Sequence, residues 1–158
     1  MKFSIRNAKL SDAETIADLY LQFWKSHEKI DPLLEFENKL TQDNQIEFAK
    51  KNIKKTSNNI FVADLNGKVI GFIEFLIKKN ENCFKIKEYG YLNLATTDKE
   101  HRGKGVAKSL TNTALQFLKN KGIKYIRTNV YNSNEIAMKT WTKIGFEPQS
   151  TLLLKKIK

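Results

Sequence analysis

The stretch Glu100-His-Arg-Gly-Lys-Gly-Val-Ala-Lys-Ser-Leu110 places two glycines among basic side chains at a predicted strand-to-helix junction. An apolar run ending at Thr97 precedes it, and a helical pattern of apolar residues follows from Val106 to Leu118. The backbone N–H groups of residues 103–107 are therefore expected to open a helix. Because such N–H groups have no carbonyl partner within the helix, they bind anions. The stretch thus predicts an anion-binding turn.

Two common phosphate-binding motifs do not fit this turn. A mononucleotide P-loop aligned on Lys108 and Ser109 requires glycine where the chain has Arg102 and Ala107. A dinucleotide fingerprint starts at Gly103 and Gly105 but meets Lys108, where helix–strand packing requires a small residue. The motif that fits is Arg102-x-x-Gly105-x-Ala107.

The first third of the chain predicts one strand followed by helices. Phe3 and Ile5 alternate with polar residues as a strand. Ser11-x-x-Glu14 is a capping box, which predicts a helix ending near Glu28. Pro32 restarts a helical pattern that runs in one or two pieces to about residue 55. Its apolar positions are Leu33, Phe36, Leu40, Ile46, Phe48 and Ile53.

The remainder predicts strands interrupted by two helices. Asn66-Gly67 is a hairpin signal between strands at 60–64 and 69–77. The further predicted strands are 84–97, 123–130, a strand at Phe146 and one at 152–154, and the helices are 106–120 and 134–143. This order predicts an α+β fold with a mixed, mainly antiparallel central sheet of six to seven strands flanked by about four helices.

Length and composition predict one domain over residues 1–158 without metal or disulfide staples. No segment approaches the roughly 20 apolar residues that cross a bilayer, so we expect a cytoplasmic protein without membrane contact. Cys83 is the single cysteine, and His27 and His101 are the two imidazoles, which excludes a zinc site or a disulfide framework.

The net charge of +11 raises the question of nucleic-acid binding. The chain has 28 basic residues, of which only Arg6, Arg102 and Arg127 are arginine. Base and bidentate phosphate recognition favour the planar guanidinium group, and the lysines are spread along the whole chain. We therefore interpret the charge as a solvated basic surface, which would still attract a polyanionic ligand.

A second motif lies C-terminal to the turn. It is Asn134-x-x-Ala137-x-x-x-Trp141-x-x-x-Gly145-Phe146. Together the two motifs and the element order resemble the GNAT superfamily of N-acetyltransferases along nearly the full chain. The resemblance implies that the turn binds the pyrophosphate of coenzyme A, that acetyl-CoA is the co-substrate, and that no metal is needed.

The resemblance also implies the residues that contact acetyl-CoA. They are Leu94, Ala95, Thr96 and Thr97 through the backbone, Arg102, Gly103, Lys104, Gly105, Val106, Ala107 and Lys108 in the turn, and Asn134, Ala137 and Trp141 in the second motif. Lys104 and Lys108 fit equally well as ordinary surface lysines. Asn134 also fits a helix N-cap. Trp141 fits a core aromatic that lines the thioester channel.

The implied reaction is direct attack of a neutral amine on the thioester, so the protein must supply a base for the ammonium proton. Glu88 is the first candidate and Glu74 the second. Many members of the superfamily place a tyrosine at the position of Trp141 to protonate the thiolate. Indole has no acidic proton near neutral pH, so the thiolate leaves unassisted or another phenol substitutes, of which Tyr131 is the nearest in sequence.

The acceptor is the least determined part of this interpretation. The segment after the first strand carries Trp24, His27, Glu28, Asp31, Glu35 and Glu37, which suit a cationic small molecule or a lysine side chain but equally fit a charged helix face. Two alternatives remain open, a non-catalytic acyl-CoA-binding regulator with the same fold and, ranked lower, a nucleic-acid-binding module. A homodimer also remains open.

Overall fold

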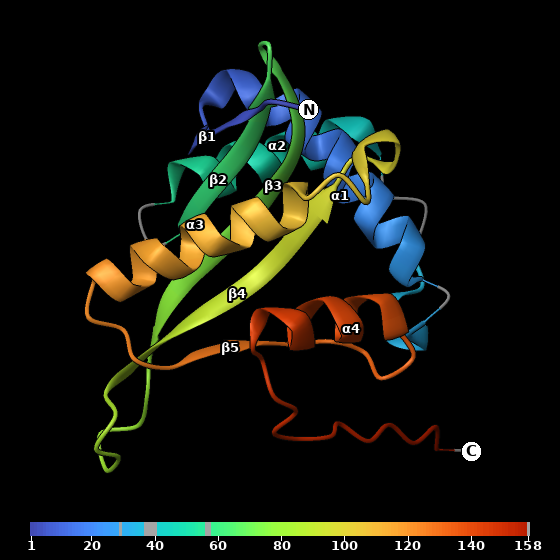
Figure 1. The fold of residues 1–158 in the computed structure, drawn as a ribbon. Coiled ribbons are helices and arrows are strands. Elements are labelled where there is room, and N and C mark those ends of the chain that lie inside the picture. Colours follow the sequence, from blue (N-terminus) through green and yellow to red (C-terminus); the bar gives the residue numbers. More distant parts are fainter. Residues whose placement is uncertain (29, 37–40, 56–57, 158) are drawn as a thin grey trace.

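The centre of the structure is a twisted sheet of five strands, shown in Figure 1. The computed structural model describes residues 1–28, 30–36, 41–55 and 58–157. The strands lie in chain order: β1 (Ser4–Asn7), β2 (Asn58–Leu65), β3 (Lys68–Lys79), β4 (Glu88–Thr97) and β5 (Ile126–Thr128). All neighbours are antiparallel except β4 and β5, which are parallel. The predicted mixed, mainly antiparallel sheet is confirmed.

Helices cover both faces of this sheet. The α-helices are α1 (Ala13–His27), α2 (Gln42–Lys54), α3 (Val106–Asn120) and α4 (Glu135–Ile144). Short 3₁₀ helices occupy η1 (Leu10–Asp12), η2 (Pro32–Leu34) and η3 (Lys99–His101). In Figure 1, α3 crosses one face and α1 and α2 lie behind the sheet, while α4 follows β5 in the chain. None of the helices in the described ranges is long and apolar enough to cross a membrane.

The prediction of six to seven strands is wrong, because the described residues form five. The strands expected at Phe146 and at 152–154 are absent, and residues 146–157 have no regular structure. The side chains of Leu152 and Leu153 are 92% and 87% exposed. An apolar run becomes a strand only when a neighbouring strand pairs with it, and this run has no such neighbour among the described residues.

Several predicted boundaries also shift. Helix α1 begins at Ala13 with Asp12 as its N-cap residue, so Ser11 is not the capping residue. Strand β4 begins at Glu88 rather than at residue 84, because residues 82–85 form turns and bends. The helical pattern after Pro32 divides into η2 and α2. Its Leu40, and Glu37 of the acidic segment, lie outside the described residues.

Alternating side chains of the strands form two hydrophobic clusters, one on each face. The cluster under α1 and α2 includes Tyr20, Val62 and Phe72. The cluster under α3 includes Leu110 and Leu118 from the helix, with Phe61, Ile73 and Phe75 from the strands. Full burial of one such side chain contributes roughly 1.5–3 kcal/mol. The two clusters therefore attach α1 and α2 to one face of the sheet and α3 to the other.

Gly71 of β3 lets α3 begin close to the sheet. A Cβ atom at this position would lie 2.9 Å from the carbonyl oxygen of Thr96 and 3.1 Å from Cγ1 of Val106. Both distances are shorter than ordinary contacts, so any larger residue would displace β4 or the first residue of α3. Because Gly71 has no side chain, the start of α3 can pack directly against the sheet at the end of β4.

The start of α1 is fixed by a charged cluster around Arg6. The Arg6 guanidinium donates to both carboxylate oxygens of Asp12, at 2.7 and 2.9 Å, and its Nε donates to Asp64 at 2.8 Å. Asp12 also accepts from the backbone N–H of Lys9 at 2.7 Å. Although burial opposes ionisation of Asp12, the Arg6 contacts hold its pKa below the ordinary value, and they do the same for Asp64.

We predict that Arg6→Ala destabilises the fold by about 2–3 kcal/mol, because it leaves the buried Asp12 carboxylate without its cation. Both aspartates have lowered pKa values when folded, so this stabilisation is present above their unfolded pKa of about 3.9 and is lost as the pH falls below it. Urea unfolding at neutral and acidic pH measures both effects. The loss should shrink in acid, and Lys68→Ala, which removes an exposed charge, should change stability by less than about 0.5 kcal/mol. An Arg6→Ala loss of that small size would contradict the cluster's role.

Candidate functional site

The predicted anion-binding turn lies between the end of β4 and the start of α3. Gly105 is the N-cap residue of α3, and no side chain caps the helix. Gly103 and Gly105 have φ values of +73° and +82°, which side chains other than hydrogen strongly disfavour. A Cβ atom at either glycine would meet nothing within 4 Å. The turn is therefore open on its outer side, and the first N–H groups of α3 have no intrahelical partner.

The basic side chains of the turn differ in their local contacts. Nε of Arg102 donates to the carbonyl oxygen of Thr97 at 3.2 Å, and Nζ of Lys104 donates to the carbonyl oxygen of Glu100 at 2.9 Å. Lys108 is exposed one turn into the helix. The first two contacts stiffen the loop, and all three cations raise the positive potential next to the free N–H groups.

Two buried polar atoms near the turn have no hydrogen-bond partner among the described residues. They are Oγ1 of Thr97, in a residue that is 8% exposed, and Oε1 of Gln22 from α1. Nε2 of the same Gln22 lies 3.5 Å from the carboxylate of Asp98, which follows Thr97. Buried polar atoms are rarely left without a partner. These two indicate that a ligand or water completes the site beside the turn.

Asp98 shapes the loop that leads into the turn. Its carboxylate accepts from the backbone N–H of Glu100 and contacts Nδ1 of His101, each at 3.0 Å. Partial burial opposes ionisation, but these contacts and Gln22 hold the pKa of Asp98 below its ordinary value. Asp98 is therefore an anion at neutral pH and serves the turn as a structural residue.

Strand β4 has a free edge next to the turn. Its pairing with β5 covers only Gly90 to Leu92, whereas its pairing with β3 continues to Thr97. A register shift opposite Glu74 and Phe75 leaves Asn93 as an extra residue and bends β4 at the point where β5 diverges. Among the described residues, 94–97 have no strand partner on that side. A ligand with amide groups could pair there as an added strand does.

Helix α4 follows β5 in the chain. Oδ1 of Asn134 accepts from the backbone N–H of Ala137 at 3.1 Å, so its predicted N-cap role is confirmed. Trp141 is half-buried against the cluster under α3, with its ring 5.2 Å from that of Phe146. The two aromatics of the second motif therefore attach α4 to the sheet.

The two candidate bases lie in different places. Glu74 is 3% exposed, lies opposite Leu94 in the β3–β4 register, and accepts a 2.7 Å hydrogen bond from the hydroxyl of Tyr20. Glu88 is exposed at the first residue of β4, whereas the turn follows the last. Ten strand residues span about 30 Å, so Glu88 and the turn lie at opposite ends of the strand.

Tyr131 forms a contact that the sequence did not reveal. Its hydroxyl donates to Oδ2 of Asp31 at 2.8 Å, which joins the loop before α4 to the segment after α1. The His27 ring lies 5.8 Å from the Tyr131 ring and stacks on Phe23. Burial first, and then the Asp31 carboxylate, raise the pKa of Tyr131. Residues 100 positions apart gave no sequence signal for this pair, apart from the acidic character of the segment.

The part of the chain that the structure describes contains no group of three or more His, Cys, Asp or Glu residues arranged to hold a metal ion. The features of the site are the helix amides, the edge of β4 and the flanking cations.

Comparison with known proteins identifies the family of this chain. A sequence model of the acetyltransferase (GNAT) family matches residues 14–146, which include the turn and the second motif. The chain belongs to the GNAT family. It is 24% identical over 150 residues to an uncharacterized N-acetyltransferase, MJ1207, of Methanocaldococcus jannaschii, covering 95% of the chain and 63% of that relative. The chain therefore spans less than two thirds of that relative's length.

Solved structures share the fold of this GNAT chain at low sequence identity. A tetramutant of the BH1408 protein from Bacillus halodurans has a TM-score of 0.85 at 19% identity, covering 98% of this chain and 99% of that one. An aminoglycoside N-acetyltransferase, AAC(6')-Iy, solved in complex with CoA, has a TM-score of 0.77 at 20% identity, with 99% and 95% covered.

We predict that Asp31→Asn lowers the pKa of the Tyr131 phenol toward its ordinary value of about 10, because it removes the carboxylate charge and keeps the side-chain shape. Ultraviolet difference titration of the tyrosines measures this. Since the pKa of Tyr131 is raised in the folded state, its hydrogen bond to Asp31 stabilises the protein fully below a pH of about 10 and less above it. Tyr131→Phe should cost about 1 kcal/mol at neutral pH. Titration curves that coincide in the two proteins would show that the contact does not form in solution.

Proposed function

We propose that the protein is an acetyl-CoA-dependent N-acetyltransferase that transfers an acetyl group directly to a primary amine of a small molecule or a protein. The observation that carries this proposal is the uncapped start of α3 beside the free edge of β4. The start of α3 offers unpaired N–H groups to a pyrophosphate, and the edge of β4 offers backbone groups to an amide-containing arm. Coenzyme A has both groups in that order, and the family supports the assignment.

The residues of the site divide between the two parts of the cofactor. The amides of residues 103–107 bind the pyrophosphate, and Arg102, Lys104 and Lys108 add positive charge. Leu94, Ala95, Thr96 and Thr97 face the pantetheine arm through their backbone, with the free hydroxyl of Thr97 as a further donor. The family resemblance adds Asn134 and Ala137, at the start of α4, and Trp141, further along it, to the residues that contact the arm.

The chemistry needs no protein nucleophile. The neutral amine nitrogen attacks the thioester carbonyl, the tetrahedral intermediate collapses, the C–S bond breaks, and the thiolate leaves with its electron pair. The amine proton passes to a base. Glu74 is better placed than Glu88, because it lies opposite Leu94 at the bend of β4, and Glu88 lies at the far end of the strand. A water or the Tyr20 hydroxyl would have to carry the proton to the buried Glu74.

Protonation of the thiolate is assigned to solvent rather than to a side chain. The Tyr131 hydroxyl already donates to Asp31, and its raised pKa makes it a poor acid. Indole cannot replace it. An ordinary thiol has a pKa of about 8.5, so unassisted departure costs little at mildly alkaline pH.

A cationic acceptor fits the segment after α1. Asp31 and the exposed Glu28 and Glu35 provide negative charge there in a chain of net charge +11. AAC(6')-Iy has been solved with a bisubstrate analogue of CoA and acetylneamine, an aminoglycoside derivative, and shares this fold. Polyamine-like small molecules and lysine side chains have the same charge, and both belong in an acceptor panel.

We predict that Gly105→Glu abolishes the thermal stabilisation by acetyl-CoA, because it places a carboxylate on the outer side of the turn where the pyrophosphate would bind. Gly67→Glu is the matched control. Gly67 also has a positive φ, of +87°, with nothing near its missing Cβ, but it lies in the β2–β3 hairpin. Both variants should lose similar stability without ligand, and only Gly105→Glu should lose the response. Equal responses in the two variants would exclude the turn as the cofactor site.

Assays of the wild-type protein distinguish an enzyme from a non-catalytic regulator and from a nucleic-acid-binding module. Release of free thiol with a panel of amines identifies an enzyme, whereas acetyl-CoA stabilisation without thiol release would identify a non-catalytic regulator. Stabilisation by an oligonucleotide but not by acetyl-CoA would identify a nucleic-acid-binding module.

We predict that Trp141→Phe lowers kcat by well under the roughly 100-fold that the loss of a general acid causes, because Trp141 packs against Phe146 and transfers no proton to the thiolate. Steady-state kinetics in acceptor and acetyl-CoA measures this. A folded variant with normal acetyl-CoA binding and a larger loss of kcat would overturn the assignment.

A further inference from the structure

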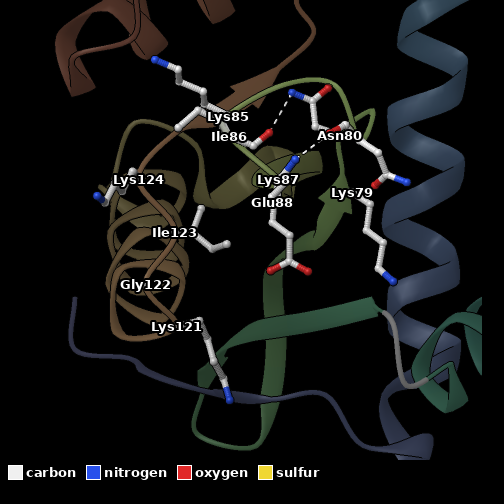
Figure 2. A pocket seen from close by; sticks show the side chains of 11 residues that line it. Lys79, Asn80, Lys85, Ile86, Lys87, Glu88, Lys121, Gly122, Ile123 and Lys124 are labelled. Atoms are coloured by element: carbon white, nitrogen blue, oxygen red, sulfur yellow. Dashed lines mark hydrogen bonds between the residues drawn. The ribbon is translucent and has the colours of Figure 1, made fainter.

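A second basic feature lies at the opposite end of the sheet from the turn. Figure 2 shows a pocket between the β3–β4 loop and the residues that follow α3. Its volume is about 480 Å³, which is in the range of sites for small ligands. Helix α3 has 15 residues, so its two ends, one near each basic feature, lie about 21 Å apart.

The pocket concentrates positive charge. Five of its eleven lining residues are lysines, compared with 28 basic residues in the 158-residue chain, and Glu88 is its one acidic lining residue. The lysines are Lys79, Lys85, Lys87, Lys121 and Lys124. Five positive charges less one negative charge give the lining a formal charge of +4. None of these lysines forms an ion pair with a carboxylate of the residues that the structure describes.

Backbone contacts hold the two walls of the pocket in place. In the β3–β4 loop, the N–H of Asn80 donates to the carbonyl oxygen of Lys87 at 2.7 Å, and its side-chain amide donates to that of Ile86 at 3.1 Å. After α3, the N–H of Ile123 donates to the carbonyl oxygen of Leu118 at 3.1 Å. The lysines of the pocket therefore extend from two ordered segments that line one pocket.

We propose that this lysine pocket binds a compact anion that carries several phosphate groups. Ammonium groups recognise charge density and impose little geometry, unlike the planar guanidinium group, which is absent from the lining. The lining also has no aromatic side chain on which a base could stack, since its apolar members are Ile86 and Ile123. Both facts favour a polyphosphate group over a nucleic acid. The site is separate from the proposed acetyl-CoA site and does not depend on it.

The test is a calorimetric titration of the intact Gly105→Glu protein with inorganic tripolyphosphate, because the turn at the other end of α3 is then blocked. Lys85→Gln/Lys124→Gln, with one lysine from each wall, should raise Kd about tenfold or more. Lys25→Gln/Lys51→Gln removes the same charge from exposed positions on α1 and α2 and should change Kd by less than about twofold. Glu88→Gln should lower Kd, because it removes the one negative charge of the lining.

Additional arms identify the source of the phosphates. Vesicles that contain a phosphoinositide bisphosphate, compared with neutral phosphatidylcholine vesicles, test a lipid headgroup against the free anion. The proposal is supported if the protein binds tripolyphosphate or the phosphoinositide vesicles and the Lys85→Gln/Lys124→Gln variant loses that binding. If Gly105→Glu does not fold, the wild type in saturating acetyl-CoA replaces it. The proposal is overturned by three results: no binding of tripolyphosphate, equal weakening in the two double variants, or tighter binding of a short single-stranded RNA through the same two lysines.

Discussion

The candidate site depends on the point at which β5 leaves β4. Between Gly90 and Leu92 the two strands pair in parallel, and Oγ1 of Thr128 also donates to the carbonyl oxygen of Leu92. After Leu92, the extra residue Asn93 bends β4, which continues along β3 alone. A strand edge that faces another strand cannot bind a ligand, so this divergence makes the edge of 94–97 available. In the proposed function, the turn and this edge bind one cofactor together, because the turn follows directly from the edge.

The position of α3 is the second condition for the site. Its apolar face packs on the sheet through Leu110, Ala114 and Leu118, while its first residue, Val106, lies against the glycine of β3 at position 71. The helix start is thereby held next to the end of β4 without a side chain of its own to cap it. At the other end, Gly122 and Ile123 donate to the last carbonyl groups, and lysines gather where the helix dipole is negative. One helix thus organises both basic features of the molecule.

Burial decides the roles of the polar residues more than their position in the chain does. Glu74 lies in the middle of an apolar strand and is kept buried by the Tyr20 hydroxyl, which itself accepts from Asn52 at 3.3 Å. Glu88 starts the next strand but lies among lysines at the distal end of the sheet. Tyr131 contacts Asp31 across the segment that faces the acceptor in the proposed reaction. In each case the neighbours come from a different part of the chain, and they determine what the side chain can do.

Local patterns determined much of this protein by themselves. The Asn66-Gly67 hairpin, the helix after Gly105, the N-cap at Asn134 and the mixed sheet follow from turn chemistry, glycine conformations and apolar periodicity, which act over a few residues. The sequence did not determine where β5 separates from β4, that residues 146–157 add no strand to the sheet of the described residues, that Glu74 is buried, or that lysines from two segments line one pocket. These features depend on which distant segments meet. Only the tertiary structure decides that, because pairing and burial are properties of neighbours in space.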